Sequence, residues 1–138
     1  MATYTDAGQL YRYVQALFAL IAEQEPGAAD AVLASRLVIR LRCTDPDAEI
    51  TINGRRRRLE TTFGPTNLRP TLDIKLAPNT LHAIMLGDLG LKQALADGLL
   101  EVRGPVWKAK ALADLFQQAQ GLYRQVLHEQ GWPEAAEP

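Results

Sequence analysis

Cysteine, serine and histidine are scarce in this sequence of 138 residues. The single cysteine, Cys43, excludes an intramolecular disulfide and a zinc site built from several thiolates. A serine nucleophile would have to be Ser35, which stands where a strand is expected to begin. Neither His82 nor His128 has a carboxylate or second histidine at metal-ligand spacing, and both are expected at the surface or near a helix end. We therefore predict no catalytic residue, no metal site and no cofactor.

Long apolar runs and an excess of one charge are missing too. The longest mainly apolar stretch, Val14 to Ala22, is far short of the about 20 residues that a transmembrane helix needs. The first six residues lack the pattern of a secretory signal. A formal net charge of -1 makes nucleic acid an unexpected partner. We expect a cytoplasmic protein with a single domain over residues 1–131 and a disordered tail at 132–138.

Apolar residues recur at helical spacing near both ends of the chain. One helix is expected to begin after Asp6 and to end at Pro26, and two short helices are expected within residues 78–96. The last helix, from Pro105 to about residue 130, would be about 39 Å long if continuous, so it should bend at Gly121 or project. Its final turns carry an apolar stripe that could complete the core, form a lid or form a homodimer seam, and we favour core or lid over dimer. The stripe consists of Leu122, Tyr123, Val126 and Leu127.

Between these helices, apolar and polar residues alternate as they do in half-buried strands. Four such segments lie between residues 35 and 76, and a fifth is expected over residues 99–103. Asn53-Gly54 predicts a two-residue type I′ turn, because both residues tolerate positive φ, and the third strand would then run from Arg55 to about Phe63. These elements predict an α+β fold in which helices cover one face of a five-stranded, mostly antiparallel sheet.

An ordered series of segments in the second half resembles the C-terminal half of the sterol carrier protein type-2 domain. The series comprises a helix that ends in glycine (Leu81–Gly87), the turn ALADG (94–98), a strand that ends in glycine (99–104) and the segment LADLF (112–116). The first half agrees in outline, so the resemblance covers about Gln9 to Phe116. The chain departs from the family pattern in its long final helix and in lacking the C-terminal targeting tripeptide of peroxisomal members.

The resemblance implies an SCP-2-like domain that encloses an apolar tunnel between its sheet and helices. Such a domain binds or transfers an apolar lipid (fatty acid, acyl-CoA, isoprenoid or sterol-like) without catalysis. The alternative is a non-catalytic accessory subunit that presents a lipid-soluble substrate, such as a quinone precursor, to a partner enzyme. Any one of the residues assigned to the tunnel would also fit an ordinary core, and Trp107 is expected as a core anchor or at the pocket mouth. The assigned residues are Leu72, Ile74, Leu81, Ile84, Met85, Leu91, Leu95, Trp107, Leu112 and Phe116.

Four consecutive arginines, Arg55, Arg56, Arg57 and Arg58, are the sharpest charge feature. On a strand their side chains would alternate between the two faces. The simplest interpretation is a solvated hairpin end that also discourages edge pairing. The functional hypothesis is transient contact with an anionic membrane surface, since each arginine would be attracted to it. Beyond the lipid and this surface, the predicted partner state is a monomer or a homodimer through the last helix.

Overall fold

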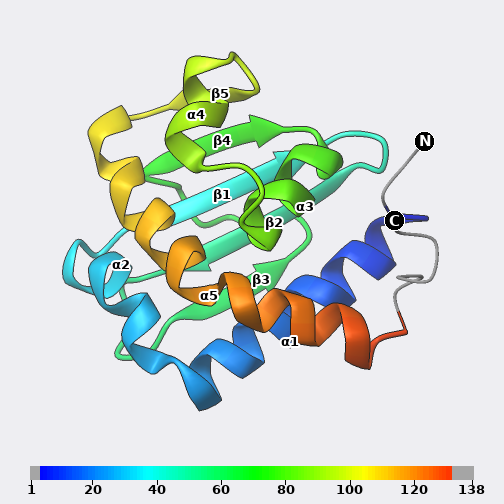
Figure 1. Cartoon of the computed structure of the whole chain (residues 1–138). Coiled ribbons are helices and arrows are strands. Elements are labelled where there is room, and N and C mark those ends of the chain that lie inside the picture. The colour runs from blue at the N-terminus through cyan, green and yellow to red at the C-terminus, as the bar shows by residue number, and fades with distance from the viewer. Residues whose placement is uncertain (1–3, 132–138) are drawn as a thin grey trace.

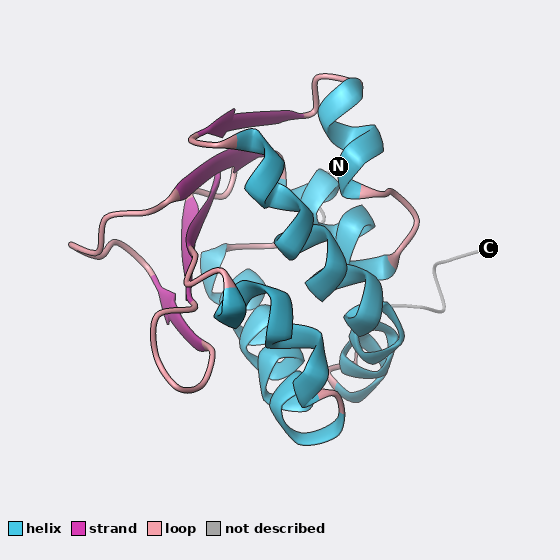
Figure 2. Cartoon of the chain, turned by 90° about the vertical axis from the view of Figure 1, so that its left-hand side faces the viewer, coloured by secondary structure: helices cyan, strands magenta, loops and turns pink. Residues whose placement is uncertain are grey.

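The protein is an open sheet backed by a layer of helices (Figure 1). The computed structural model describes residues 4–131, so the predicted tail at 132–138 lies outside the described residues. The helices lie on one face of the sheet and leave the other face open (Figure 2), as the sequence predicts. The strands are β1 (Val38–Cys43), β2 (Ala48–Asn53), β3 (Glu60–Phe63), β4 (Leu72–Leu76) and β5 (Leu100–Arg103). The helices are α1 (Ala7–Gln24), η1 (Pro26–Ala29), α2 (Asp30–Ala34), α3 (Pro78–Leu86), α4 (Leu91–Ala96), η2 (Val106–Lys108) and α5 (Ala109–Glu129).

The five strands lie in the order β3-β2-β1-β4-β5. Three of the neighbouring pairs are antiparallel, and β1 and β4 are parallel, so the mostly antiparallel prediction is confirmed. The parallel pair exists because the chain crosses from β3 at one edge to β4 beyond β1. Residue alternation cannot reveal this, since it reports which face a side chain takes and not which strand lies beside it.

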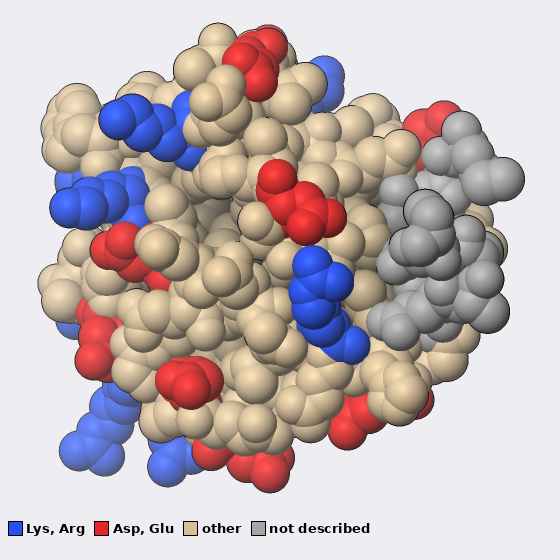
Figure 3. Space-filling model, in the orientation of Figure 1, with Lys and Arg blue, Asp and Glu red and all other residues tan. Residues whose placement is uncertain are grey.

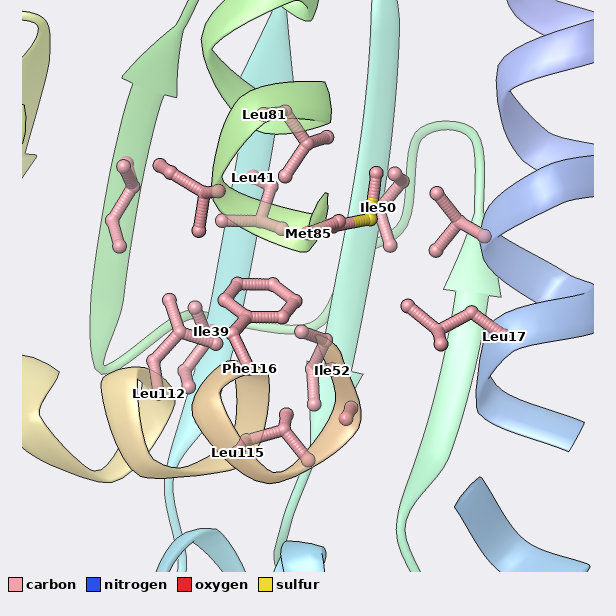
Figure 4. Close-up of a cluster of buried hydrophobic side chains, with 14 of the residues drawn as sticks. Leu17, Ile39, Leu41, Ile50, Ile52, Leu81, Met85, Leu112, Leu115 and Phe116 are labelled. Carbon is pink, nitrogen blue, oxygen red and sulfur yellow. The ribbon is translucent and has the colours of Figure 1, made fainter. Parts of the chain in front are cut away.

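The helix-facing side of the sheet packs against α1, α3 and α5 in one continuous core. Figure 4 shows Met85 of α3 and Phe116 of α5 lying over the strand side chains Ile39, Leu41 and Ile52. All five side chains are buried, and each contributes about 1.5–3 kcal/mol through loss of contact with water. These side chains therefore fill the central part of the space between sheet and helices.

Local signals explain where two helices begin or end. At the start of α1, a carboxylate oxygen of Asp6 accepts a hydrogen bond from the backbone N–H of Gln9 at 2.8 Å, so Asp6 caps the helix and the predicted start is confirmed. At the end of α3, Gly87 takes a left-handed conformation with φ 83°. Glycine suits that position because other residues are strained there.

The predicted tight turn at Asn53-Gly54 is wrong. β2 ends at Asn53 and β3 does not begin until Glu60, so the intervening residues, including the arginine run, form a loop and not a strand. The N–H of Gly54 donates to the carbonyl oxygen of Leu37 at 2.7 Å, and a Cβ at Gly54 would lie 2.7 Å from the carbonyl oxygen of Val32. Glycine is needed here for close backbone approach, and not for positive φ.

The last helix does not project from the domain. α5 runs through Gly121 without interruption and crosses the helical layer diagonally, against α1, α2 and α3 (Figure 1). Tyr123, Val126 and Leu127 of the predicted stripe are buried within this chain, and Leu122 is half-buried. The prediction that the stripe completes the core is confirmed, and these three side chains are not available for a dimer seam. Within residues 4–131, no helix is both long and apolar enough to span a membrane.

Candidate functional site

Two adjoining hollows lie where α4 and the first half of α5 meet the β4–β5 side of the sheet. The outer hollow has a volume of about 420 Å³ and the inner one about 380 Å³, both within the range typical of small-molecule sites. They share Leu91, Lys92 and Ala113, and we call the pair the α4–α5 groove. The outer hollow is also lined by Ile74, Leu95, Leu100, Val102, Val106, Trp107, Ala109 and Lys110, and the inner one by Ile84, Gly87, Leu89, Gly90, Phe116, Gln117 and Gln120.

Small residues on α5 keep this groove open. Ala109 and Ala113 are one helical turn apart, so they present a shallow strip to α4. Phe116, which is buried, lines the inner hollow one turn further on. The charged side chains that line the groove are Lys92 and Lys110, both exposed. An apolar surface with ammonium groups at its rim is complementary to an amphiphile with an anionic head.

The structure divides the residues assigned to the tunnel lining into two groups. Six of them line the α4–α5 groove, namely Ile74, Ile84, Leu91, Leu95, Trp107 and Phe116. The other four are fully buried core residues beneath it, namely Leu72, Leu81, Met85 and Leu112. The described residues thus form a groove over a packed core, and a tunnel through that core stays a prediction.

Trp107 is not a core anchor. Its side chain is 78% exposed, and it lines the outer end of the groove, which is the second position considered for it. The connection before it is tight, because Gly104 has φ 113° and a Cβ there would collide with the carbonyl oxygen of Thr71. The chain then enters the short helix η2, which directs Trp107 toward solvent and not along the buried stripe of α5.

A separate hollow of about 520 Å³ lies on the α1–α2 side of the molecule, and we call it the arginine hollow. Only Arg57 and Arg58 of the arginine run line it. Nε of Arg56 lies 3.9 Å from Oε1 of Glu60. Both side chains are well exposed, so this ion pair adds little stability. The arginine hollow is also lined by Phe18, Ile21, Ala22, Pro26, Ala29, Asp30, Leu33 and Leu59.

Sequence reasoning missed a buried polar cluster. The hydroxyl groups of Tyr4 and Tyr123 are 2.5 Å apart, and the Tyr123 hydroxyl lies 2.8 Å from Nδ1 of His82. Burial raises the pKa of both tyrosines, so both hydroxyls are protonated near neutral pH. His82 is half-buried in this cluster and not a plain surface residue as predicted. No local pattern could reveal a contact between residues so distant in sequence.

Two other titratable groups, the Cys43 thiol and the Asp73 carboxylate, lie in surroundings that shift their pKa values. Cys43 is buried at the end of β1, as expected, and burial raises the pKa of its thiol to about 12, so it is not an activated nucleophile. On the open face of the sheet, Asp73 accepts hydrogen bonds from Arg40 at 2.6 Å and Arg42 at 2.9 Å. Partial burial by itself would raise the pKa of Asp73, but the two arginines together lower it. Among the described residues, no group of three or more His, Cys, Asp or Glu side chains could hold a metal ion.

Comparison with known proteins decides the family. The model of the SCP-2 sterol transfer family matches residues 17–117. The chain belongs to this family. The match confirms the resemblance seen in the sequence, and it includes all five strands and most of the groove. No curated protein matches the chain significantly.

Solved structures show the same fold. The sterol carrier protein domain 2 of Helicoverpa armigera has a TM-score of 0.67 at 17% identity, and the alignment covers 88% of this chain and 95% of that domain. Palmitated SCP2L2 from Aedes aegypti has a TM-score of 0.57 at 16% identity, and the alignment covers 78% of this chain and 93% of that protein. The ubiquinone synthesis protein UbiJ-SCP2 has a TM-score of 0.59 at 16% identity, and the alignment covers 81% of this chain and 93% of that protein.

Proposed function

We propose that this protein binds a lipid with one long apolar chain in the α4–α5 groove and exchanges it without catalysis. The observation that carries the proposal is that two neighbouring hollows share Leu91 and Ala113 in their lining, with the exposed Lys92 and Lys110 at the rim. A fatty acid or acyl ester fits this chemistry, because its chain is apolar and its head is anionic or polar. The palmitated relative supports a fatty acyl ligand. The cytoplasmic location predicted from the sequence is part of this proposal.

The energetics favour reversible binding. A chain that buries about ten methylene groups gains about 8 kcal/mol, at about 0.8 kcal/mol each. The cost of association is of similar size, about 4–15 kcal/mol, so the net affinity is modest. The two exposed lysines would orient an anionic head more than they would strengthen binding, since exposed charge pairs contribute about 0–1 kcal/mol. Modest affinity suits a protein that must release its ligand.

The groove supports binding better than catalysis. Its lining residues are chiefly aliphatic, and its two lysines are exposed and not buried beside a base. The tyrosine–histidine cluster and Cys43 lie outside the lining, so neither is placed to act on a bound lipid. We therefore assign no catalytic role to any residue of this site.

Native mass spectrometry of the purified protein tests the proposal directly. We expect an adduct of at most one lipid per chain, and organic extraction should recover a fatty acyl lipid. A protein recovered without ligand should bind a fluorescent fatty acid that palmitate displaces. A clean apo mass that persists after incubation with fatty acids, isoprenoids and sterols would contradict the proposal.

The second candidate function is that of a non-catalytic accessory subunit. It is favoured by the likeness to UbiJ-SCP2, whose name refers to ubiquinone synthesis. In that case the groove would hold a lipid-soluble substrate, such as a quinone precursor, for a partner enzyme. Stoichiometric copurification of an enzyme at native expression level would support this function. The same protein purified alone, with a fatty acyl adduct, would favour the carrier.

A further inference from the structure

Several loops leave the sheet at the same end. Asn53 at the end of β2 pairs with Val38 at the start of β1, and Arg103 at the end of β5 pairs with Asp73 near the start of β4. Because β1 and β4 are parallel, their starts lie side by side. The loop over residues 54–59, which we call the arginine loop, follows β2, and η2 follows β5. Both therefore lie at one end of the molecule. Three strand spacings separate them, about 14 Å.

This end carries an exposed apolar corner. Trp107 is 78% exposed and Val106 is 43% exposed on η2, and the exposed Lys108 and Lys110 follow them. An exposed tryptophan is unusual on a protein surface that contacts only water. Tryptophan beside lysine is typical of surfaces that sit at a bilayer interface, because the ring is amphipathic and the ammonium group pairs with lipid phosphate.

The same end is rich in exposed arginine. Arg36 stands shortly before β1, Arg69 shortly before β4 and Arg103 at the end of β5, and all three are exposed. The four arginines of the 54–59 loop are exposed as well. Figure 3 shows basic side chains at two places along the left edge, with some acidic ones between them. Since the whole chain has a net charge of -1, this local concentration of positive charge is not a general property of the surface.

The α4–α5 groove and the arginine hollow both have lining residues at this end. Trp107 and Lys110 line the outer part of the α4–α5 groove, and Arg57 and Arg58 line the arginine hollow, together with Asp30 as an acidic neighbour. A surface placed against this end would thus contact residues of both openings. A lipid could then pass between a bilayer and the groove with little exposure of its chain to water.

We infer that this end, with Trp107 inserted and the arginines on lipid phosphates, docks on an anionic bilayer. The inference rests on the proposed lipid-binding function, since docking would serve loading and release of the ligand. The occupant is a bilayer and not a protein, because one isolated aromatic corner flanked by spread positive charge matches a fluid anionic surface. A protein partner would require a contiguous apolar patch of some size.

The test uses the full chain with Trp132→Phe, so that Trp107 is the one fluorophore of its class. Vesicles of phosphatidylcholine containing one third phosphatidylglycerol should shift the Trp107 emission to shorter wavelength, and added salt should reverse the shift. Pure phosphatidylcholine vesicles should leave it unchanged. An emission that stays at the solvent-exposed wavelength with the anionic vesicles would overturn the inference.

A charge variant separates docking from ligand binding. Arg55→Gln, Arg56→Gln and Lys108→Gln together should weaken sedimentation with the anionic vesicles by about 100-fold. These three residues line neither the α4–α5 groove nor the arginine hollow, so binding of a fluorescent fatty acid in solution should not change. Vesicle binding equal to that of the native protein would refute the docking surface and leave the groove proposal standing. Failure of the native protein itself to bind the fatty acid would instead refute the proposed function.

The matched control removes the same amount of charge elsewhere. Arg12→Gln, Lys75→Gln and Arg124→Gln change exposed residues of α1, the open face of β4 and the second half of α5. This control should sediment with the anionic vesicles within about twofold of the native protein. An equal loss in both triple variants would show that net charge acts without a specific face, and would overturn the inference.

Discussion

Filling the α4–α5 groove at Ala113 is the most direct test of where the ligand lies. Ala113 is half-buried and lines both hollows, so Ala113→Leu places three additional carbon atoms at their junction. A chain that spans the junction would lose the burial of about four methylene groups, or about 3 kcal/mol. That loss corresponds to an increase in Kd of about 150-fold for palmitate.

The fold should tolerate this change. The added atoms would occupy open groove space and not a packed core, so the free energy of unfolding should change by less than about 1 kcal/mol. Ala96→Leu is the control, since it makes the same change at an exposed site of α4 outside the groove. Displacement of a fluorescent fatty acid by palmitate gives Kd, and urea unfolding gives stability. Equal Kd values for native protein, Ala113→Leu and Ala96→Leu would refute the assignment of the ligand to this groove.

Three further predictions concern stability, measured by urea unfolding followed by circular dichroism. Gly54→Ala should destabilise the protein by at least about 2 kcal/mol, because its Cβ would lie 2.7 Å from a backbone carbonyl oxygen, and a change below about 0.5 kcal/mol would contradict the close approach. Tyr123→Phe should cost at least about 1 kcal/mol through loss of its hydrogen bonds with Tyr4 and His82, and unchanged stability would mean that this polar cluster does not stabilise the fold. Asp73→Asn should cost about 2 kcal/mol at pH 7, since it removes a carboxylate that accepts from two arginines. The pKa of Asp73 is lowered in the folded protein, so its contribution is present above the unfolded value of about 3.9 and is lost as the pH falls through the folded value. The difference between Asp73→Asn and native protein should therefore shrink below about pH 4, and a difference that grows there would refute the assignment.

The elements themselves follow from local pattern. Apolar residues alternate in β1, β2 and β4 because one face of each strand is buried, and the cap at Asp6 and the glycine at Gly87 mark helix ends by local backbone chemistry. The family could be recognised for the same reason, because its segments follow one another in a set order along the chain. Six of the predicted site residues line the groove, since residues that face the helical layer near its edge also face its openings.

Tertiary contacts overruled local pattern at two places. Asn53-Gly54 carries the preferences of a tight turn, but Gly54 is held against the segment that joins α2 to β1, so the chain loops out before β3 begins. Trp107 has the size and hydrophobicity of a core residue, but it lies on η2, outside the buried stripe of α5, and is 78% exposed. In both cases the outcome depends on how distant segments meet, which propensities do not include.

The layers of this protein, its family and the apolar character of its helix-facing side follow from the sequence alone. Residue periodicity indicates which face of a strand or helix is buried, because that pattern is local. Which apolar residues are core and which line open space depends on how distant segments pack, because the groove requires the small side chains of Ala109 and Ala113 opposite α4. Strand pairing also brings the arginine loop and Trp107 to one end of the sheet, since the parallel pairing of β1 with β4 sets where distant loops emerge.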